Sequence, residues 1–147
     1  MGMTVRPLRV EDREQWQQLW DGYNQFYERT LPDEITEVSW ARFFDPVEAM
    51  FAAVAELDGR LVGLVHFLYH RSTTMIENVC YLQDLFTAPD ARGMGAGGAL
   101  IDHVYREAGR AGLCRVYWQT HEANPARMLY DRVATLTPFL RYVKELA

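Results

Sequence analysis

The sequence has no apolar run that approaches the roughly 18 residues a membrane-spanning helix needs, and it has no signal-peptide core. It also has no surplus of basic side chains, because 15 Lys and Arg stand against 20 Asp and Glu and give a formal net charge of −5. Nucleic-acid binders neutralise phosphates with clustered basic residues, so this balance argues against such a partner. We expect a soluble, cytoplasmic protein that binds neither nucleic acid nor a membrane.

Cysteine is also scarce, since the chain has only Cys80 and Cys114, and neither lies in a Cys-x-x-Cys pair. Two cysteines do not build a disulfide framework in a chain of 147 residues, although they could form a single bridge. We expect two buried, reduced thiols. Neither cysteine lies in a motif that would make it a nucleophile, so we expect no covalent enzyme intermediate, and we assign no metal site.

The patterning that is present suits one globular domain, which we place at residues 4–147. Apolar residues make up 49% and charged residues 24% of the chain, which is typical of a folded protein. Hydrophobic periodicity predicts the elements. The expected strands are residues 4–10, two arms of a hairpin within 50–70, and residues 75–87, 114–121 and 139–146. The expected helices are residues 11–27, 37–44, 97–112 and 124–133. Asp58-Gly59 marks the hairpin turn, and the central run of strands predicts a mixed sheet.

Four glycines fall within residues 93–98, between an expected strand and the start of an expected helix. N–H groups are unpaired at a helix start, so the expected partner is a phosphate or pyrophosphate, although a plain tight turn is the alternative. A Walker loop is excluded, because no Gly-Lys-Ser/Thr follows. A dinucleotide fingerprint is formally matched by Gly93-x-Gly95-x-x-Gly98. However, residues 88–92 separate it from the strand, and the 25 residues after Glu122 are too few to complete a doubly wound sheet.

A third phosphate loop, Arg/Gln-x-x-Gly-x-Gly/Ala, is matched in full by residues 92–97. With the strings YLQDLFTAPDARGMGAGGALI and NPARMLYDR, nearly the whole chain resembles the GNAT family of acetyl-CoA-dependent N-acetyltransferases. The Tyr-Leu-x-Asp-x-Phe strand is similar to the branch of histone/polyamine and spermidine/spermine acetyltransferases. The resemblance implies an α/β (α+β) GNAT fold, with a central mixed sheet of six to seven strands and about four helices.

The same resemblance implies an activity, the transfer of an acetyl group from acetyl-CoA to a primary amine by direct attack in a ternary complex. The alternative is a non-catalytic acyl-CoA-binding module with the same fold. Gln83 keeps that alternative open, because the polyamine branch often has Glu there and an amide cannot accept the proton.

The resemblance also implies which residues hold coenzyme A. Strand backbone at Leu85, Phe86 and Thr87 would pair with the pantetheine amides like an added strand. Asn124 would be a coenzyme contact or only a helix cap, because the family spacing Asn-x-x-Ala-x-x-Leu-Tyr is one residue shorter here. The residues that would form the pyrophosphate loop are Arg92, Gly93, Met94, Gly95, Ala96, Gly97 and Gly98.

Tyr130 matches the family tyrosine that protonates the departing thiolate, although its place on an apolar helix face also suits a core residue. Asp84 is the first candidate for the general base, acting through water, and a structural carboxylate is the alternative. The further candidates for the base are Glu77, Glu122 and His121. A water chain without a single base is also allowed, since much of the rate can come from positioning.

The acceptor is expected to be a small-molecule or peptide amine. Acidic residues between the first two helices border the acceptor cleft in this family, so they would bind a cationic amine or form a solvated loop. These acids are Glu28, Asp33, Glu34 and Glu37. Many relatives dimerise, and residues 139–146 offer a strand edge, so we expect a homodimer.

Overall fold

Residues 2–147, the part of the chain that the structure describes, form a five-stranded sheet with four α-helices. The structure is a computed structural model. Its strands are β1 (Met3–Pro7), β2 (Met50–Leu57), β3 (Arg60–His70), β4 (Val79–Thr87) and β5 (Val116–Tyr117). Its helices are α1 (Arg13–Phe26), α2 (Asp33–Phe43), α3 (Ala96–Arg110) and α4 (Arg127–Val133), with 3-10 turns η1 (Val10–Asp12) and η2 (Pro89–Ala91).

The sheet follows the order β1-β2-β3-β4-β5, antiparallel from β1 to β4 and parallel between β4 and β5. The hairpin between β2 and β3 turns at Asp58 and Gly59, whose φ angles are 51° and 79°. Two positive φ angles in a two-residue turn match the right-handed twist of the strands, which is why Asp-Gly is favoured there. The predicted hairpin and the predicted mixed pairing are both confirmed.

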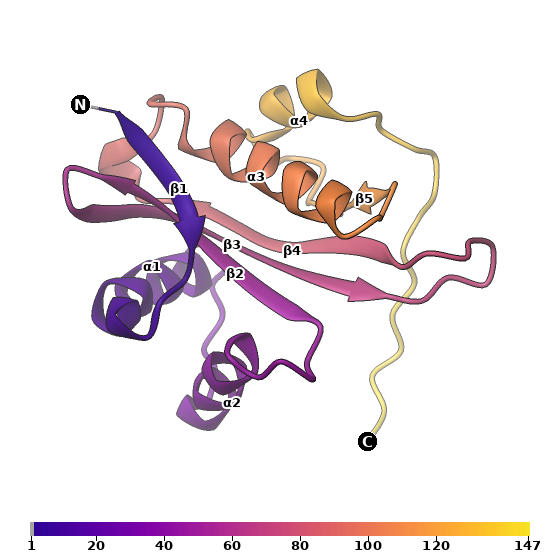
Figure 1. The fold of residues 1–147 in the computed structure, drawn as a ribbon, viewed down its shortest axis with the longest axis horizontal. Helices are drawn as coiled ribbons and strands as arrows, with labels where there is room; N and C mark the ends of the chain where they lie inside the picture. The colour runs from indigo at the N-terminus through magenta and orange to yellow at the C-terminus, as the bar shows by residue number, and fades with distance from the viewer. Residues whose placement is uncertain (1) are drawn as a thin grey trace.

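Helices cover both faces of the sheet, with α1 and α2 on one side and α3 and α4 on the other (Figure 1). The middle strand, β3, is buried at every residue from Leu61 to Phe67, as expected for a strand covered on both faces. The helix α1 buries Trp16, Leu19, Trp20, Tyr23 and Asn24. The helix α3 buries Ala96, Leu100, Ile101, His103, Val104 and Ala108.

The strands β4 and β5 lie side by side at one end only. Their parallel pairing joins Cys80 to Val116 and Tyr81 to Tyr117, whereas β4 continues to Thr87. Beyond Tyr81, therefore, no strand of the described chain pairs with the edge of β4 that faces β5. We call this opening the β4–β5 split. The segment after β4 leads directly into η2 and the start of α3, so the predicted phosphate loop lies at the mouth of the split.

The C-terminal segment differs from its prediction. Residues 135–147 contain no helix or strand, so the strand expected at residues 139–146 is wrong. The described chain has five strands instead of six to seven for the same reason. The segment leads away from the domain (Figure 1), and its large apolar side chains are exposed. Apolar patterning shows that a segment could form a strand, but a strand needs an edge to pair with.

Smaller differences affect the first strand and the cysteines. The strand expected at residues 4–10 ends at Pro7, because Val10 begins a 3-10 turn. Cys80 is buried as predicted, and burial raises the pKa of its thiol to about 12. Cys114 is exposed, which contradicts the prediction of two buried thiols, and its thiol bonds to the carboxylate of Glu77. Both cysteines are free.

Candidate functional site

The open edge of β4 presents the backbone groups of two residues to the split. The Ala88 N–H donates to the Val62 carbonyl at 2.8 Å, so Ala88 is hydrogen-bonded to β3. Backbone groups alternate in direction along an antiparallel strand, so those of Phe86 also face β3. Those of Leu85 and Thr87 then face the split. An extended ligand in the split could pair with these two residues as an added strand.

The glycine loop leaves three backbone donors without a helical partner at the mouth of the split. Gly93 and Gly95 have φ angles of 83° and 88°, a left-handed backbone that glycine adopts without strain. The first hydrogen bond of α3 joins the Ala99 N–H to the Gly95 carbonyl. The N–H groups of residues 96–98 therefore have no helical partner, and the positive end of the helix dipole adds to them. This arrangement suits an anion.

The helix α4 closes the same end of the split. A Cβ added to Gly97 would lie 3.2 Å from Leu129, so α4 packs directly on the start of α3. Tyr130 meets Trp118 edge-on, with ring centroids 5.5 Å apart. Burial, followed by the neighbouring phenol of Tyr27, raises the pKa of Tyr130 to about 12. Its hydroxyl therefore keeps its proton throughout the neutral pH range.

Asn124 shapes the turn that precedes α4. Its Oδ1 accepts the Ala126 N–H at 2.9 Å, and its Nδ2 donates to Thr120 Oγ1 at 2.8 Å. The helix itself begins at Arg127. Asn124 thus caps the preceding turn, and both ends of its amide are already used within the chain.

On the opposite face of β4, a chain of buried hydrogen bonds ends at Asp84. Trp16 Nε1 donates to His66 Nε2 at 3.1 Å, and His66 Nδ1 lies 2.9 Å from Asp84 Oδ2. Because Nε2 accepts, the neutral imidazole carries its proton on Nδ1 and donates it to the carboxylate. Tyr23 adjoins the same carboxylate, and burial and then the charge of Asp84 raise the pKa of its phenol. The orientation of Asp84 is therefore fixed from several sides.

Asp84 and Gln83 both line a pocket of about 230 Å³, which we call the acceptor pocket. Consecutive residues of a regular strand face opposite sides, but β4 has a bulge here. His66 pairs with Asp84 and Phe67 pairs with Leu82, so Gln83 is the extra residue. The walls are mainly aromatic and aliphatic side chains, and the one Arg or Lys among the lining residues described is Arg29.

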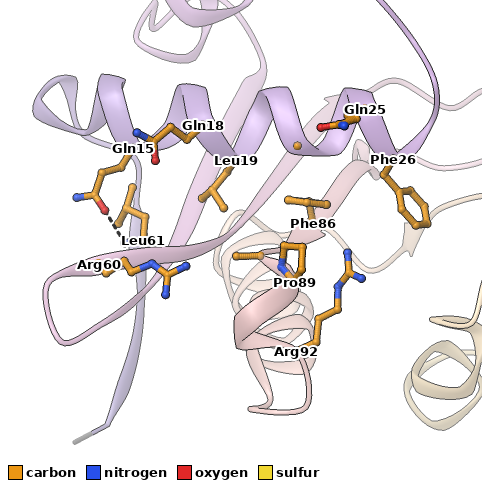
Figure 2. Close-up of a pocket in the computed structure, with 12 residues that line it drawn as sticks. Gln15, Gln18, Leu19, Gln25, Phe26, Arg60, Leu61, Phe86, Pro89 and Arg92 are labelled. Atoms are coloured by element: carbon orange, nitrogen blue, oxygen red, sulfur yellow. Dashed lines mark hydrogen bonds between the residues drawn. The ribbon is translucent and has the colours of Figure 1, made fainter.

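A wider pocket of about 720 Å³ lies between α1 and the end of β4 (Figure 2). Three glutamine side chains of α1 line it. Arg92 holds its guanidinium over the Phe86 ring, 5.9 Å from the ring centroid. Of the predicted cofactor residues, only Phe86 and Arg92 are among the described residues that line this pocket. Neither Asp84 nor Tyr130 lines it. This pocket adjoins the predicted site without holding its reactive groups.

The structure brings most of the predicted site together. Leu85, Thr87 and residues 92–98 border the split, and Tyr130 lies on α4, which packs on the start of α3. Asp84 lies on the α1 face of the same strand. Phe86 is the exception among the predicted cofactor strand residues, because its backbone faces β3 and its ring packs on Tyr23 of α1. Sequence reasoning missed Trp16 and His66, which have only the signature of a core helix and a core strand. Of the two alternatives for the acids after α1, the structure favours solvated side chains, since these four residues are exposed and do not line the acceptor pocket: Glu28, Asp33, Glu34 and Glu37.

A model of the Acetyltransferase (GNAT) family matches residues 15–134 of the chain. The chain belongs to this family. It is 34% identical over 143 residues to the D-amino-acid N-acetyltransferase HPA3 of Saccharomyces cerevisiae, an alignment that covers 95% of this chain and 89% of that protein. It resembles the solved ribosomal-protein-alanine N-acetyltransferase from Brucella melitensis biovar Abortus 2308, with a TM-score of 0.82, 23% identity, and 99% and 100% of the two chains covered.

A second solved structure is an aminoglycoside acetyltransferase from an uncultured soil metagenomic sample, with a TM-score of 0.82, 16% identity, and 99% and 97% of the two chains covered. These structural likenesses carry the fold alone. With the family match and the yeast relative, they confirm the predicted GNAT fold and the predicted N-acetyltransferase class, and acetyl-CoA is the cosubstrate of that family. No helix within residues 2–147 has the length and apolar character to cross a membrane.

The buried series of hydrogen bonds from Trp16 through His66 to Asp84 leads to a prediction about stability. His66→Leu should lower the free energy of unfolding by about 2–4 kcal/mol, because a buried carboxylate loses its charge-assisted donor. His66→Gln should lose less than half as much, since its amide can accept from Trp16 and donate to Asp84. Urea denaturation measures both variants.

The control is His70→Leu, at an exposed histidine that bonds the Tyr117 hydroxyl. Its unfolding free energy should fall by less than about 1 kcal/mol. Equal losses of unfolding free energy in His66→Leu and His70→Leu would show that the buried hydrogen bonds do not contribute more to stability than an exposed one.

Proposed function

We propose that this GNAT acetyltransferase moves the acetyl group of acetyl-CoA to a primary amine by direct attack in a ternary complex. The observation that carries the proposal is the split of β4 from β5. It has free backbone donors at its mouth, and the strand beside it carries Asp84 on its α1 face. A cosubstrate in the split and an amine in the acceptor pocket would approach the same strand from its two sides. Holding two reactants in this way supplies much of the rate by itself.

The proposed cofactor site follows the split from its mouth inward. The free N–H groups of residues 96–98 would bind the pyrophosphate of coenzyme A, and the loop from Gly93 to Gly95 would let it approach. Arg92 would add charge nearby. Leu85 and Thr87 would pair with the pantetheine amides, while the ring of Phe86 packs beneath α1. Met94 and Ala96 would contribute backbone only.

Asn124 has a narrower role in the proposed cofactor site than its resemblance to the family implied. Its amide is already bonded to Ala126 and Thr120. We propose that it orders the turn before α4 and so positions Leu129 and Tyr130. A direct contact with coenzyme A stays a prediction.

Two side chains would carry the protons. Asp84 would accept a proton from the bound ammonium through water, and His66 would hold the carboxylate in place as a positioning residue. The lone pair of the neutral amine would then attack the thioester carbon. The nitrogen would lose its second proton to water, and the carbon–sulfur bond would break. Tyr130 would donate its proton to the departing sulfur and regain one from solvent. The raised pKa of Tyr130 supports this role, because its hydroxyl is still protonated when the thiolate forms.

For the acceptor, we propose a small amino compound of the amino-acid type. The yeast relative acts, by its name, on D-amino acids. The histone/polyamine branch is the second candidate, and its support is the Tyr-Leu-x-Asp-x-Phe strand. A polyamine would need several acids in the acceptor pocket. Asp84 is the only Asp or Glu among the lining residues described, and Arg29 would oppose a polycation.

The first test is a screen of amines for acetyl-CoA turnover. Free CoA should appear only when an amine is present, and Asp84→Asn should lower kcat/KM by about 10²–10⁴ as expected for loss of a general base. Val47→Asn, a change at an exposed residue outside the site, should leave turnover unchanged. Tight acetyl-CoA binding without turnover by any amine would favour the non-catalytic module instead.

Gly98 offers a test of the phosphate loop that spares the fold. A Cβ at Gly98 would meet only Leu129 at 3.7 Å, an ordinary contact, and a helix start tolerates acidic and amide side chains. Gly98→Asp should raise the Kd for acetyl-CoA at least tenfold, about 1.4 kcal/mol, through repulsion of the pyrophosphate. Gly98→Asn has the same shape without the charge, so its Kd should stay within about threefold of wild type. Calorimetry measures both, and equal affinities would remove the phosphate assignment.

Tyr130→Phe tests the proposed acid. The ring packing against Trp118 is kept, so stability and acetyl-CoA affinity should hold, while kcat should fall by roughly 10²–10⁴. Because the pKa of Tyr130 is raised to about 12, wild type should lose this proton only as the pH approaches that value. A kinetic profile from about pH 6 to 10 should therefore have the same shape in both proteins. Near-normal kcat in the variant would make Tyr130 a packing residue only.

We also propose that residues 4–147 act as one domain and that two copies form a homodimer through the C-terminal segment. That segment exposes Leu136, Phe139, Leu140, Tyr142, Val143 and Leu146, an apolar surface that an isolated copy leaves in water. The absence of nucleic-acid and membrane partners and the cytoplasmic location stay predictions from the sequence.

Light scattering should therefore find a dimer at micromolar concentration. The double variant Phe139→Asp with Leu140→Asp should be monomeric, because charges replace apolar contacts at the interface. Ile76→Asp alters an equally exposed apolar residue between β3 and β4 and should stay dimeric. A wild-type protein that is only monomeric would refute the proposal.

A further inference from the structure

Arg29 lines the acceptor pocket and has no acidic partner in the described chain. It follows the end of α1 and is exposed, yet none of the ion pairs among residues 2–147 includes it. The only side-chain hydrogen bond it makes within those residues comes from its Nε. The two Nη groups of its guanidinium are therefore free to bind a ligand.

The backbone that carries Arg29 is fixed by the end of α1. The Glu28 N–H donates to the Gln25 carbonyl and the Arg29 N–H donates to the Asn24 carbonyl, both at 2.9 Å. These two bonds form a Schellman motif, which normally has glycine at the position that Glu28 occupies. Glu28 has a φ of 52°, a left-handed conformation that other residues rarely adopt. Strain of this kind collects where a structure must hold a functional group in place.

The side chain of Arg29 is fixed by the same helix. Its Nε donates to Asn24 Oδ1 at 2.9 Å, and Asn24 Nδ2 donates in turn to the Trp20 carbonyl at 2.9 Å. The guanidinium also stacks on the rings of Tyr23 and Tyr27, 5.4 Å and 5.5 Å from their centroids. Because Nε is bonded and the guanidinium plane is held by two rings, the edge of the guanidinium that carries the two Nη groups points in one direction. Such a fork matches a carboxylate with two parallel hydrogen bonds.

We propose that Arg29 binds the carboxylate of the acceptor and thereby selects amino acids over simple amines. The proposal rests on the proposed function, because it places the reacting amine beside Asp84. Tyr23 relates the two charges, since its ring stacks on Arg29 and its phenol adjoins Asp84. A zwitterion carries its ammonium and its carboxylate on one carbon, so its carboxylate can bind Arg29 while its ammonium lies near Asp84 and reaches it through water.

The rest of the acceptor pocket suits the side chain of an amino acid. Trp20, Phe43 and Leu31 supply apolar walls to the same pocket as the two charged groups. An apolar or aromatic side chain would displace water from these walls, and the two charges would fix its orientation. Phenylalanine is therefore a suitable probe, and 2-phenylethylamine is the same molecule without the carboxylate.

The test compares these two acceptors in steady-state kinetics, with both enantiomers of phenylalanine. Wild type should prefer one enantiomer of phenylalanine to 2-phenylethylamine in kcat/KM. Arg29→Met keeps the aliphatic stem and removes the charge. It should lower kcat/KM for phenylalanine at least about 30-fold, mainly through KM, as expected when a charged hydrogen-bonded partner is lost. Turnover of 2-phenylethylamine should change by less than about threefold, because that acceptor has no group for Arg29.

Two further variants separate recognition from general effects. Arg42→Met removes the same charge from α2 at an arginine that does not line the acceptor pocket, so it should leave both acceptors unaffected. Asn24→Ala leaves the Arg29 charge but removes its hydrogen-bonded support. It should raise KM for phenylalanine while changing KM for 2-phenylethylamine much less. Equal losses on both acceptors in Arg29→Met would overturn the proposal, as would a wild-type preference for the amine.

A binding measurement keeps the inference distinct from the proposed function. Trp16 and Trp20 line the acceptor pocket, so tryptophan fluorescence should report phenylalanine binding in the presence of CoA. If no amine is turned over, the proposed function fails. Carboxylate-dependent binding that Arg29→Met abolishes would still support the Arg29 site. Equal binding of phenylalanine by wild type and Arg29→Met, or no binding by either, would overturn it.

Discussion

The parting of β4 from β5 is the constraint on which the rest of this molecule depends. Two residue pairs hold the strands together, and after Tyr81 one edge of β4 has no strand beside it in the described chain. Unpaired backbone groups inside a protein are costly unless something binds them. A sheet interrupted in this way is stable because α3 and α4 close it from one face and α1 from the other. The same interruption makes room for an extended ligand.

The strand β4 offers two separate surfaces, because its edge and its α1 face present different groups. Its edge presents the backbone of Leu85 and Thr87, and its α1 face carries Asp84 and Phe86. The bulge at Gln83 interrupts the regular alternation and brings Asp84 into the pocket beside it. A buried chain of hydrogen bonds from Trp16 through His66 then fixes the carboxylate. Reactive groups supported on strands and helices are held more closely than groups on loops.

Local signals in the sequence predicted part of the site, and long-range pairing decided the remainder. The glycine loop, the helix after it and the Asp58-Gly59 turn depend on backbone preferences of neighbouring residues, so they can be predicted from short stretches. Trp16 and His66 are fifty positions apart, and their contact exists only after α1 packs on β3. The C-terminal strand was predicted from the apolar residues of the segment, which do not show whether a partner edge is available. Arg29 could not be singled out from the sequence. Its two unbonded Nη groups become apparent only when the contacts of its guanidinium with Asn24, Tyr23 and Tyr27 are known.

The sequence by itself determined the family, the order of the elements through α4 and the positions of the glycine loop and Tyr130. These follow from residue types at short spacing, where backbone geometry permits few alternatives. Only the tertiary structure decided which side chains face one another. It placed the acids after α1 outside the acceptor pocket, brought Asp84 and Arg29 to its lining and left the last thirteen residues without a strand. The physical reason is that burial, charge pairing and strand pairing are properties of contacts between distant segments, which no local pattern encodes.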